Sequence, residues 1–293
     1  MQMDLKERIN IFFELTKIRI TLFVTLTTCF GFVVASKSIN STIILPTLGV
    51  LLLACGAAVI NHIQERKTDK LMDRTKNRPL PSGKISFNEA VVIALILLVI
   101  GSLLISFTAG LAALGLGLLN LVWYNVIYTP LKKKTAFAII PGSLVGAIPP
   151  AIGWVAGGGS LTDPRIAFIS FFFFIWQIPH FWLLLFIFGK DYEQAGFPTL
   201  TKIFSLNQLG RITFIWILTT IIICLFLPMF GVVKSSYINI GLLLSGFWLS
   251  WNALKLLRPK FELQQFKSAF YNINLFVILV VFLVSVDSLF ILY

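Results

Sequence analysis

The chain has 293 residues, of which 57% are hydrophobic and only 12% charged, and its mean hydropathy is +0.90. A water-soluble domain of this size does not tolerate such a composition, so we predict an integral membrane protein. The formal net charge of +12 does not indicate a nucleic-acid partner, because the sequence has no basic stripe or stacking platform and membrane topology explains the charge.

Apolar stretches separated by short polar segments follow one another along the whole chain. A transmembrane helix needs roughly 20 apolar residues to cross a hydrocarbon core about 30 Å thick. These stretches are apolar on every face, whereas a transmembrane β-strand has about 10 residues of alternating polarity. We therefore predict an all-α membrane protein with one domain over residues 1–293. Its nine spans are expected near 18–36, 42–63, 89–107, 109–128, 136–156, 166–188, 209–230, 236–254 and 271–291.

The basic residues predict the orientation of these spans. Of the 24 Lys and Arg residues, only Lys37, Arg165 and Lys234 fall on one side of the predicted membrane. By the positive-inside rule the richer side, which includes the N-terminal tail, is cytoplasmic, so nine spans place the C-terminus outside. The tail has no cleavage site and no transit composition, which favours a multi-pass protein of a bacterial plasma membrane.

The second predicted span ends in a row of polar residues. Asn61, Glu65, Asp69 and Asp73 are spaced by four, and the first three cover roughly 80° of one helix face. Carboxylate and amide oxygens suit Mg²⁺ bridged to a diphosphate, and arginines such as Arg74 can bind the remaining phosphate charge. The spacing alone is equally compatible with a helix that leaves the membrane and is stabilised by pairs of opposite charge.

Two further groups of polar residues follow on the same side. The fourth span ends in Tyr124, Asn125 and Tyr128, just before a run of three lysines that could also be plain topological anchors. The sixth span contains His180, which is either a functional residue or a buried neutral histidine. It is followed by the acidic segment 190–193, which, considered by itself, indicates a solvated loop. The convergence of three helices on one membrane face is what a site requires.

At this point the residues resemble a known family, the UbiA-type intramembrane prenyltransferases, and within it the haem branch of protoheme IX farnesyltransferases. The segments after the sixth span favour the haem branch. The motifs that carry the resemblance are NHIQERKTD at 61–69, DRTKNRPL at 73–80, YTPLK at 128–132, WQIPHF at 176–181, KDY at 190–192 and AGFP at 195–198.

The resemblance implies transfer of the farnesyl group of farnesyl diphosphate to a vinyl group of haem b, with addition of water, to give haem O. Haem b is then a substrate, Mg²⁺ the cofactor, and a haem A synthase or terminal oxidase a possible partner. The implied metal ligands are Asn61, Glu65, Asp69 and Asp191, and the first three act in catalysis together with Tyr128. The implied diphosphate ligands are Arg74, Arg78, Lys132 and Lys190, and the implied haem contacts are His62 and His180.

Two departures from the family pattern leave other interpretations open. Glu65 stands where the family usually has Asp, and the segment around Asp191 lacks the repeated aspartates of quinone-pathway relatives. One alternative is a prenyltransferase that acts on a quinone precursor. Another is a transporter of an anionic solute, although transporters usually place their site at the bilayer midplane rather than at one face.

Overall fold

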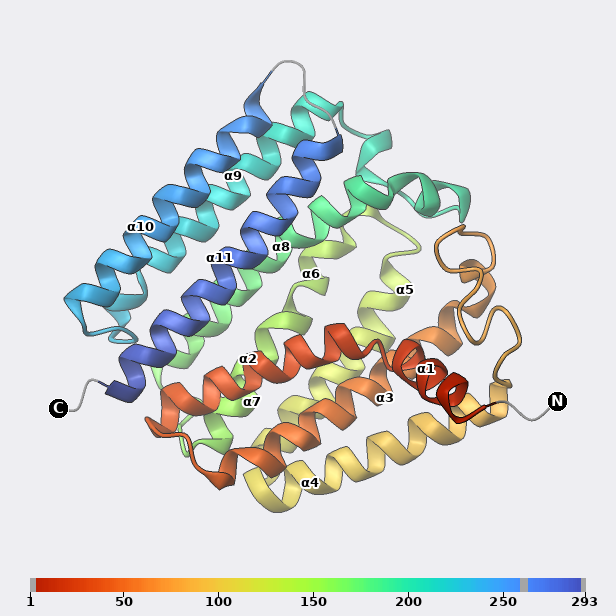
Figure 1. Ribbon diagram of the computed structural model, residues 1–293, viewed down its shortest axis with the longest axis horizontal. Coiled ribbons are helices and arrows are strands. Elements are labelled where there is room, and N and C mark those ends of the chain that lie inside the picture. Colours follow the sequence, from red (N-terminus) through yellow and green to blue (C-terminus); the bar gives the residue numbers. More distant parts are fainter. Residues whose placement is uncertain (1–3, 259–262, 291–293) are drawn as a thin grey trace.

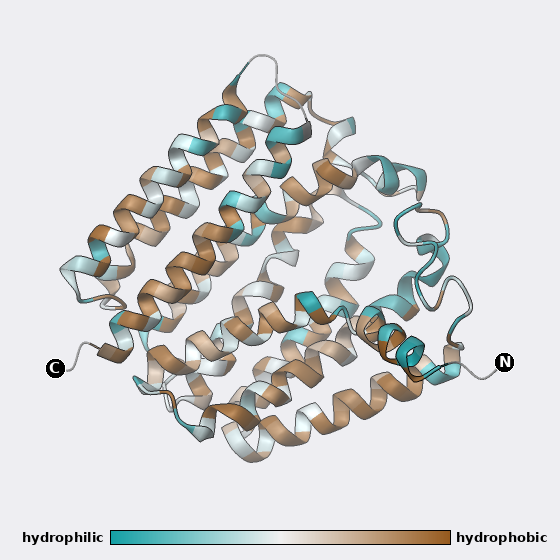
Figure 2. Ribbon diagram, viewed as in Figure 1, coloured by the Kyte–Doolittle hydropathy of each residue, from teal (hydrophilic) through white to brown (hydrophobic). Residues whose placement is uncertain are grey.

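The computed structural model describes residues 4–258 and 263–290, and all regular secondary structure in these two ranges is helical. Eight helical segments in the described part of the chain are long and apolar enough to cross a membrane. Figure 2 shows that most residues of these helices are hydrophobic, whereas hydrophilic residues gather in the segment between α3 and α4. The predicted all-α, multi-pass membrane fold is therefore confirmed.

The helices follow one another in an order close to the prediction (Figure 1). A surface helix, α1 (Leu5–Leu15), precedes α2 (Ile18–Ser36), α3 (Ile44–Asp69) and α4 (Phe87–Val122). The short α5 (Thr129–Leu131) and α6 (Ile139–Gly142) lead to α7 (Leu144–Ala156). The last four are α8 (Pro164–Gln194), α9 (Leu206–Leu225), α10 (Ser236–Ala253) and α11 (Leu263–Phe290). Helices α3 and α8 continue about six residues beyond their predicted spans, and both extensions are polar.

The third and fourth predicted spans form one helical hairpin without a loop. The helical segment Phe87–Leu131 has 45 residues, about 68 Å at 1.5 Å per residue, which is twice the thickness of a hydrocarbon core. It reverses at Gly110, whose φ of 82° and ψ of 178° are accessible to glycine but costly for other residues. The nine predicted spans thus correspond to eight helical segments in the described ranges, one of which has two legs.

Glycines bring the helices of the first half into close contact. A Cβ atom at Gly31 of α2 would overlap the carbonyl of Pro150 on α7, and one at Gly153 of α7 would overlap the carbonyl of Thr28 on α2. Without a hydrophobic effect between helices in lipid, such close backbone approach increases the dispersion contacts that hold them together. Helix α7 is fixed in this way against α2.

Helix α8 lies at the centre of the bundle and packs against α7, α9 and α11. Its inward face carries Phe172, Phe173 and Trp176, which are almost completely buried. Because α8 is about 45 Å long, it connects two opposite ends of the bundle. The α3–α4 segment and α5 lie beside its C-terminal end (Figure 1).

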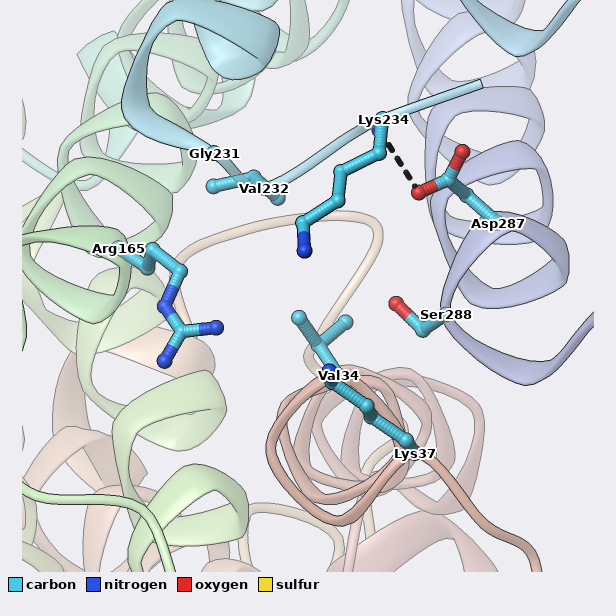
Figure 3. A pocket seen from close by; sticks show the side chains of 8 residues that line it. All are labelled: Val34, Lys37, Arg165, Gly231, Val232, Lys234, Asp287 and Ser288. Atoms are coloured by element: carbon cyan, nitrogen blue, oxygen red, sulfur yellow. Dashed lines mark hydrogen bonds between the residues drawn. The ribbon is translucent and has the colours of Figure 1, made fainter. Parts of the chain in front are cut away.

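A small hollow lies at the N-terminal end of α8. It is lined by the three basic residues predicted to lie outside, Lys37, Arg165 and Lys234 (Figure 3). Asp287 of α11 shapes this hollow by accepting hydrogen bonds from the backbone N–H groups of Lys234 and Ser235, at 3.0 and 2.8 Å. The three cations therefore share one end of the bundle, opposite the polar extensions of α3 and α8.

Candidate active site

The polar row of α3 faces the interior of the protein. Asn61 and Asp69 are 0% exposed and Glu65 is 5% exposed, so the spacing of four places all three on one buried face. Asp73 does not continue the row, because α3 ends at Asp69 and the next segment turns away. The side chain of Asp73 is 71% exposed and pairs with Lys76 at 2.7 Å. The row therefore has three members.

Each carboxylate of the row is held by a basic side chain. Lys132 Nζ lies 2.5 Å from Glu65 Oε1, and Arg78 Nη1 donates to both carboxylate oxygens of Asp69 at 3.0 Å. Burial, the largest single effect, acts to lower the pKa of Lys132, but the Glu65 carboxylate together with Tyr128 and Tyr192 raises the pKa above its usual value. These are buried ion pairs whose members depend on one another.

The extension of α8 joins the same site through Arg74. Its Nε atom lies 3.8 Å from Asp191 Oδ2, and its guanidinium lies over the Phe188 ring, 4.7 Å from the centroid. Phe188 departs from helical geometry, with φ −116° and ψ 15°, so α8 bends just before Asp191. Lys190, also predicted to bind diphosphate, is exposed on this extension and forms no ion pair within the described ranges.

Lys17 is a site residue that the sequence interpretation missed. It lies between α1 and α2 in the left-handed conformation, with φ 50° and ψ 46°, and its Nζ donates to Asn61 Oδ1 at 2.6 Å and to the Tyr124 hydroxyl at 3.3 Å. Burial lowers the pKa of Lys17 to about 7, against the opposing effect of Glu65. In the sequence Lys17 is one of several cytoplasmic cations, and no spacing links it to Asn61.

A π-helical turn, Trp123–Tyr128, forms the aromatic wall of the site. The wider turn stacks Tyr124 on Tyr128, with centroids 6.1 Å apart, and places Lys132 Nζ 5.6 Å from the centre of the Tyr128 ring. Asn125 anchors the turn on α3 by donating to the Ala57 carbonyl at 3.0 Å. Such π-turns are frequent at functional sites.

The two histidines differ in their surroundings. His62 is 1% exposed, and neither of its ring nitrogens has a hydrogen-bond partner among the described residues. His180 is half-buried on α8, with its Nδ1 atom 2.7 Å from Asn274 Oδ1 on α11. Asn274 was not predicted, because 94 residues separate it from His180.

The row of α3 suits a metal that arrives with its own ligands. No three His, Cys, Asp or Glu side chains in the described part of the chain lie close enough to hold a metal ion. The row does offer an amide oxygen and two carboxylates, surrounded by cations. This donor set fits Mg²⁺, which takes few protein ligands and completes its shell with phosphate oxygens and water.

A family model described as the UbiA prenyltransferase family matches residues 24–282. The chain belongs to the UbiA prenyltransferase family. Within this UbiA family it is 31% identical over 277 residues to the protoheme IX farnesyltransferase of Oleidesulfovibrio alaskensis, covering 94% of this chain and 95% of that protein. It is 38% identical over 204 residues to the protein of the same name from Geobacter sulfurreducens, covering 69% and 74% of the two chains.

Solved structures of UbiA proteins share the fold. A digeranylgeranylglyceryl phosphate synthase superposes with a TM-score of 0.78 at 18% identity, over 97% of this chain and all of that one. A UbiA homologue from Archaeoglobus fulgidus, solved with GPP and Mg²⁺, gives a TM-score of 0.70 at 15% identity over 94% and 99% of the chains. This UbiA chain is therefore an enzyme of the prenyltransferase family with the fold of its distant relatives.

Proposed function

We propose that this UbiA enzyme transfers the farnesyl group of farnesyl diphosphate to a vinyl group of haem b, with addition of water. The observation that carries the proposal is the buried row of Asn61, Glu65 and Asp69, with each side chain paired to a cation. Such an arrangement accepts a Mg²⁺–diphosphate unit by exchange, because the oxygens turn to the metal while the cations turn to the phosphates. The names of the relatives support haem as the acceptor.

The Asn61 amide oxygen and the carboxylates of Glu65 and Asp69 would hold Mg²⁺. Asp191 would become a fourth oxygen ligand as the metal and diphosphate bind, because in the described residues the three carboxylates do not lie close enough to hold a metal ion together. Bound there, Mg²⁺ neutralises charge that develops on the leaving diphosphate. Arg78, Lys132 and Arg74 would bind the same phosphates, Arg78 and Arg74 through their guanidinium groups. Lys190, which is exposed on the same extension of α8 as Asp191, would supply a further cation to the phosphates.

The reaction begins when the bond between C1 of the farnesyl chain and its phosphate oxygen breaks, with the electron pair leaving on diphosphate. The Tyr128 ring lies beside Lys132 and the Tyr124 ring stacks on it, and the faces of these two rings would stabilise the allylic cation that remains. The vinyl π electrons of haem then form the new bond to C1. Water adds to the cation produced on the haem side chain and loses a proton, which gives a hydroxyethylfarnesyl group.

A quinone precursor is the principal alternative acceptor, since the diphosphate end of the site would be the same. To decide, the purified protein is incubated with farnesyl diphosphate, Mg²⁺ and haem b, with and without a chelator, and the haems are analysed by mass spectrometry. We expect haem that carries one farnesyl group and one water, and its loss on chelation. If haem b remains unmodified while diphosphate is released with a quinone precursor, the haem assignment is wrong.

A matched pair of variants tests the metal row in the same assay. Asp69→Asn keeps the shape of a buried row member but removes its charge, and we expect turnover to fall at least about 100-fold, as for loss of an electrostatic contact in an active site. Asp73→Asn makes the same change four residues later, beyond the end of α3 and at an exposed position, and turnover should be nearly unchanged. Equal effects of the two changes would contradict the proposed row.

A further inference from the structure

His180 and Asn274 form a polar pair between α8 and α11 in aromatic surroundings. The rings of Trp176 and Phe270 each lie 5.0 Å from the His180 ring, centroid to centroid. A polar pair between membrane helices is costly unless its groups are matched. The atoms of this pair are matched in a way that determines which ring nitrogen carries the proton.

The orientation of the Asn274 amide follows from its second contact. Asn274 Nδ2 donates to the Phe270 carbonyl at 2.6 Å, so its Oδ1 atom is the one that faces His180, where it can only accept. His180 Nδ1, 2.7 Å away, must therefore be the protonated donor. In a neutral imidazole this leaves the lone pair on Nε2, which makes no hydrogen bond within the described ranges.

This arrangement has the chemistry of a metal-binding histidine. Histidines that bind metals almost always donate their other N–H to an oxygen, which fixes the tautomer and the plane of the ring. His62 contrasts with His180, because both of its nitrogens are enclosed and unpartnered among the described residues. Of the two histidines, only His180 combines an oriented ring with a position that is not fully buried.

His180 also lies next to the proposed diphosphate site. The Phe181 ring is 5.5 Å from the His180 ring and 6.1 Å from the Tyr128 ring, and Lys132 lies over the latter. Two aromatic rings, those of Phe181 and Tyr128, therefore lie between the His180 ring and Lys132, one of the cations that would hold diphosphate. A planar acceptor bound at Nε2 would contact the aromatic surroundings and lie beside the farnesyl C1 atom.

We propose that His180 Nε2 binds the iron of the haem substrate and that Asn274 is the positioning residue that fixes the imidazole for this bond. The inference rests on the proposed function, because it takes haem as the acceptor. The iron remains in one oxidation state and only positions the porphyrin. His62 has no part in the bond.

The test is spectroscopic and needs no turnover. Ferric haem b is titrated into the purified full-length protein, and absorption and electron paramagnetic resonance spectra are recorded for the wild type and for His180→Gly, with and without added imidazole. We expect a histidine-ligated spectrum in the wild type, its loss in His180→Gly and its return with imidazole. A His180→Gly protein that keeps the wild-type spectrum overturns the proposal, as does a wild type without a histidine-ligated spectrum.

Two variants of α11 test the positioning role. Asn274→Leu should weaken haem affinity about 10- to 100-fold, as expected for loss of the group that orients a metal ligand, and should alter the spectrum. Asn272→Leu, on the same helix but without a hydrogen bond to His180, should do neither. Haem ligation without farnesyl transfer would support the role of His180 and reject the proposed function. Farnesyl transfer without ligation by His180 would support the proposed function and reject the role of His180.

Discussion

Replacing Lys132 with Met tests whether the cations of the site are structural partners of the acidic row. Lys132 and Glu65 have side chains that are only 18% and 7% exposed, and their charged atoms are 2.5 Å apart. Removing one member of a buried ion pair typically costs about 3 to 5 kcal/mol, because the other charge is left without a partner. Lys132→Met should therefore destabilise the protein although it adds apolar surface.

The double variant Glu65→Gln/Lys132→Met gives the sharper result. It removes both charges, so it should recover most of the lost stability, with a coupling free energy of about 2 to 4 kcal/mol between the two positions. Using about 2 to 4 °C per kcal/mol, Lys132→Met should lower the melting temperature by roughly 10 °C and the double variant by much less.

The assay is thermal unfolding of the purified protein in one detergent, followed by intrinsic fluorescence for the wild type, both single variants and the double variant. Lys133→Met is the matched control, because Lys133 is the adjacent lysine and is exposed. Additive effects of the two single changes would refute the argument that Lys132 and Glu65 act as a pair. Farnesyl transfer should be lost in Lys132→Met and should not return in the double variant.

Three further predictions concern ligands, packing and pH. Mg²⁺ alone should barely change the melting temperature. Mg²⁺ with a non-reactive farnesyl thiodiphosphate at 100 times its Kd should raise the free energy of unfolding by about 2.7 kcal/mol. A large shift with Mg²⁺ alone would contradict the proposal that the carboxylates exchange their cations for the metal only when diphosphate binds. Gly153→Ala should cost about 1 to 3 kcal/mol, measured by thermal unfolding, because its methyl group would overlap the carbonyl of Thr28. Asp163 caps α8 and binds Arg165, whose hydrogen bond lowers the pKa of Asp163. Asp163→Ala should therefore lower the free energy of unfolding by about 1 kcal/mol at neutral pH. Melting curves should show that the difference between the wild type and the variant vanishes as the pH falls below about 4, because Asp163 then becomes protonated as the pH passes through its lowered pKa.

The sequence predicted those features that depend on neighbouring residues. The hydropathy pattern placed the spans, and the spacing of four placed Asn61, Glu65 and Asp69 on one face of a helix, because both signals follow from helix geometry. Asp73 continues the spacing of four but does not share this face, because the helix stops before it.

The pairings of charges could not be predicted, because they depend on how distant helices pack. The α3–α4 segment is rich in basic residues of similar local context, yet Arg78 pairs with Asp69 while Arg74 reaches Asp191 on α8. Lys17 and Asn61 are 44 residues apart. In these cases the residue types indicated that a polar site exists, but tertiary packing determined which cation pairs with which oxygen.

The hairpin of α4 affects how deeply the protein sits in the bilayer. Its tip carries Phe107 and Leu111, which are 84% and 78% exposed on either side of the Gly110 reversal. A tip of this kind is most stable below the headgroups and resists being drawn into water. The two legs therefore set how deeply the protein sits, and a thinner or thicker membrane would move Tyr124 and Tyr128, and the site that they line, relative to the lipid headgroups.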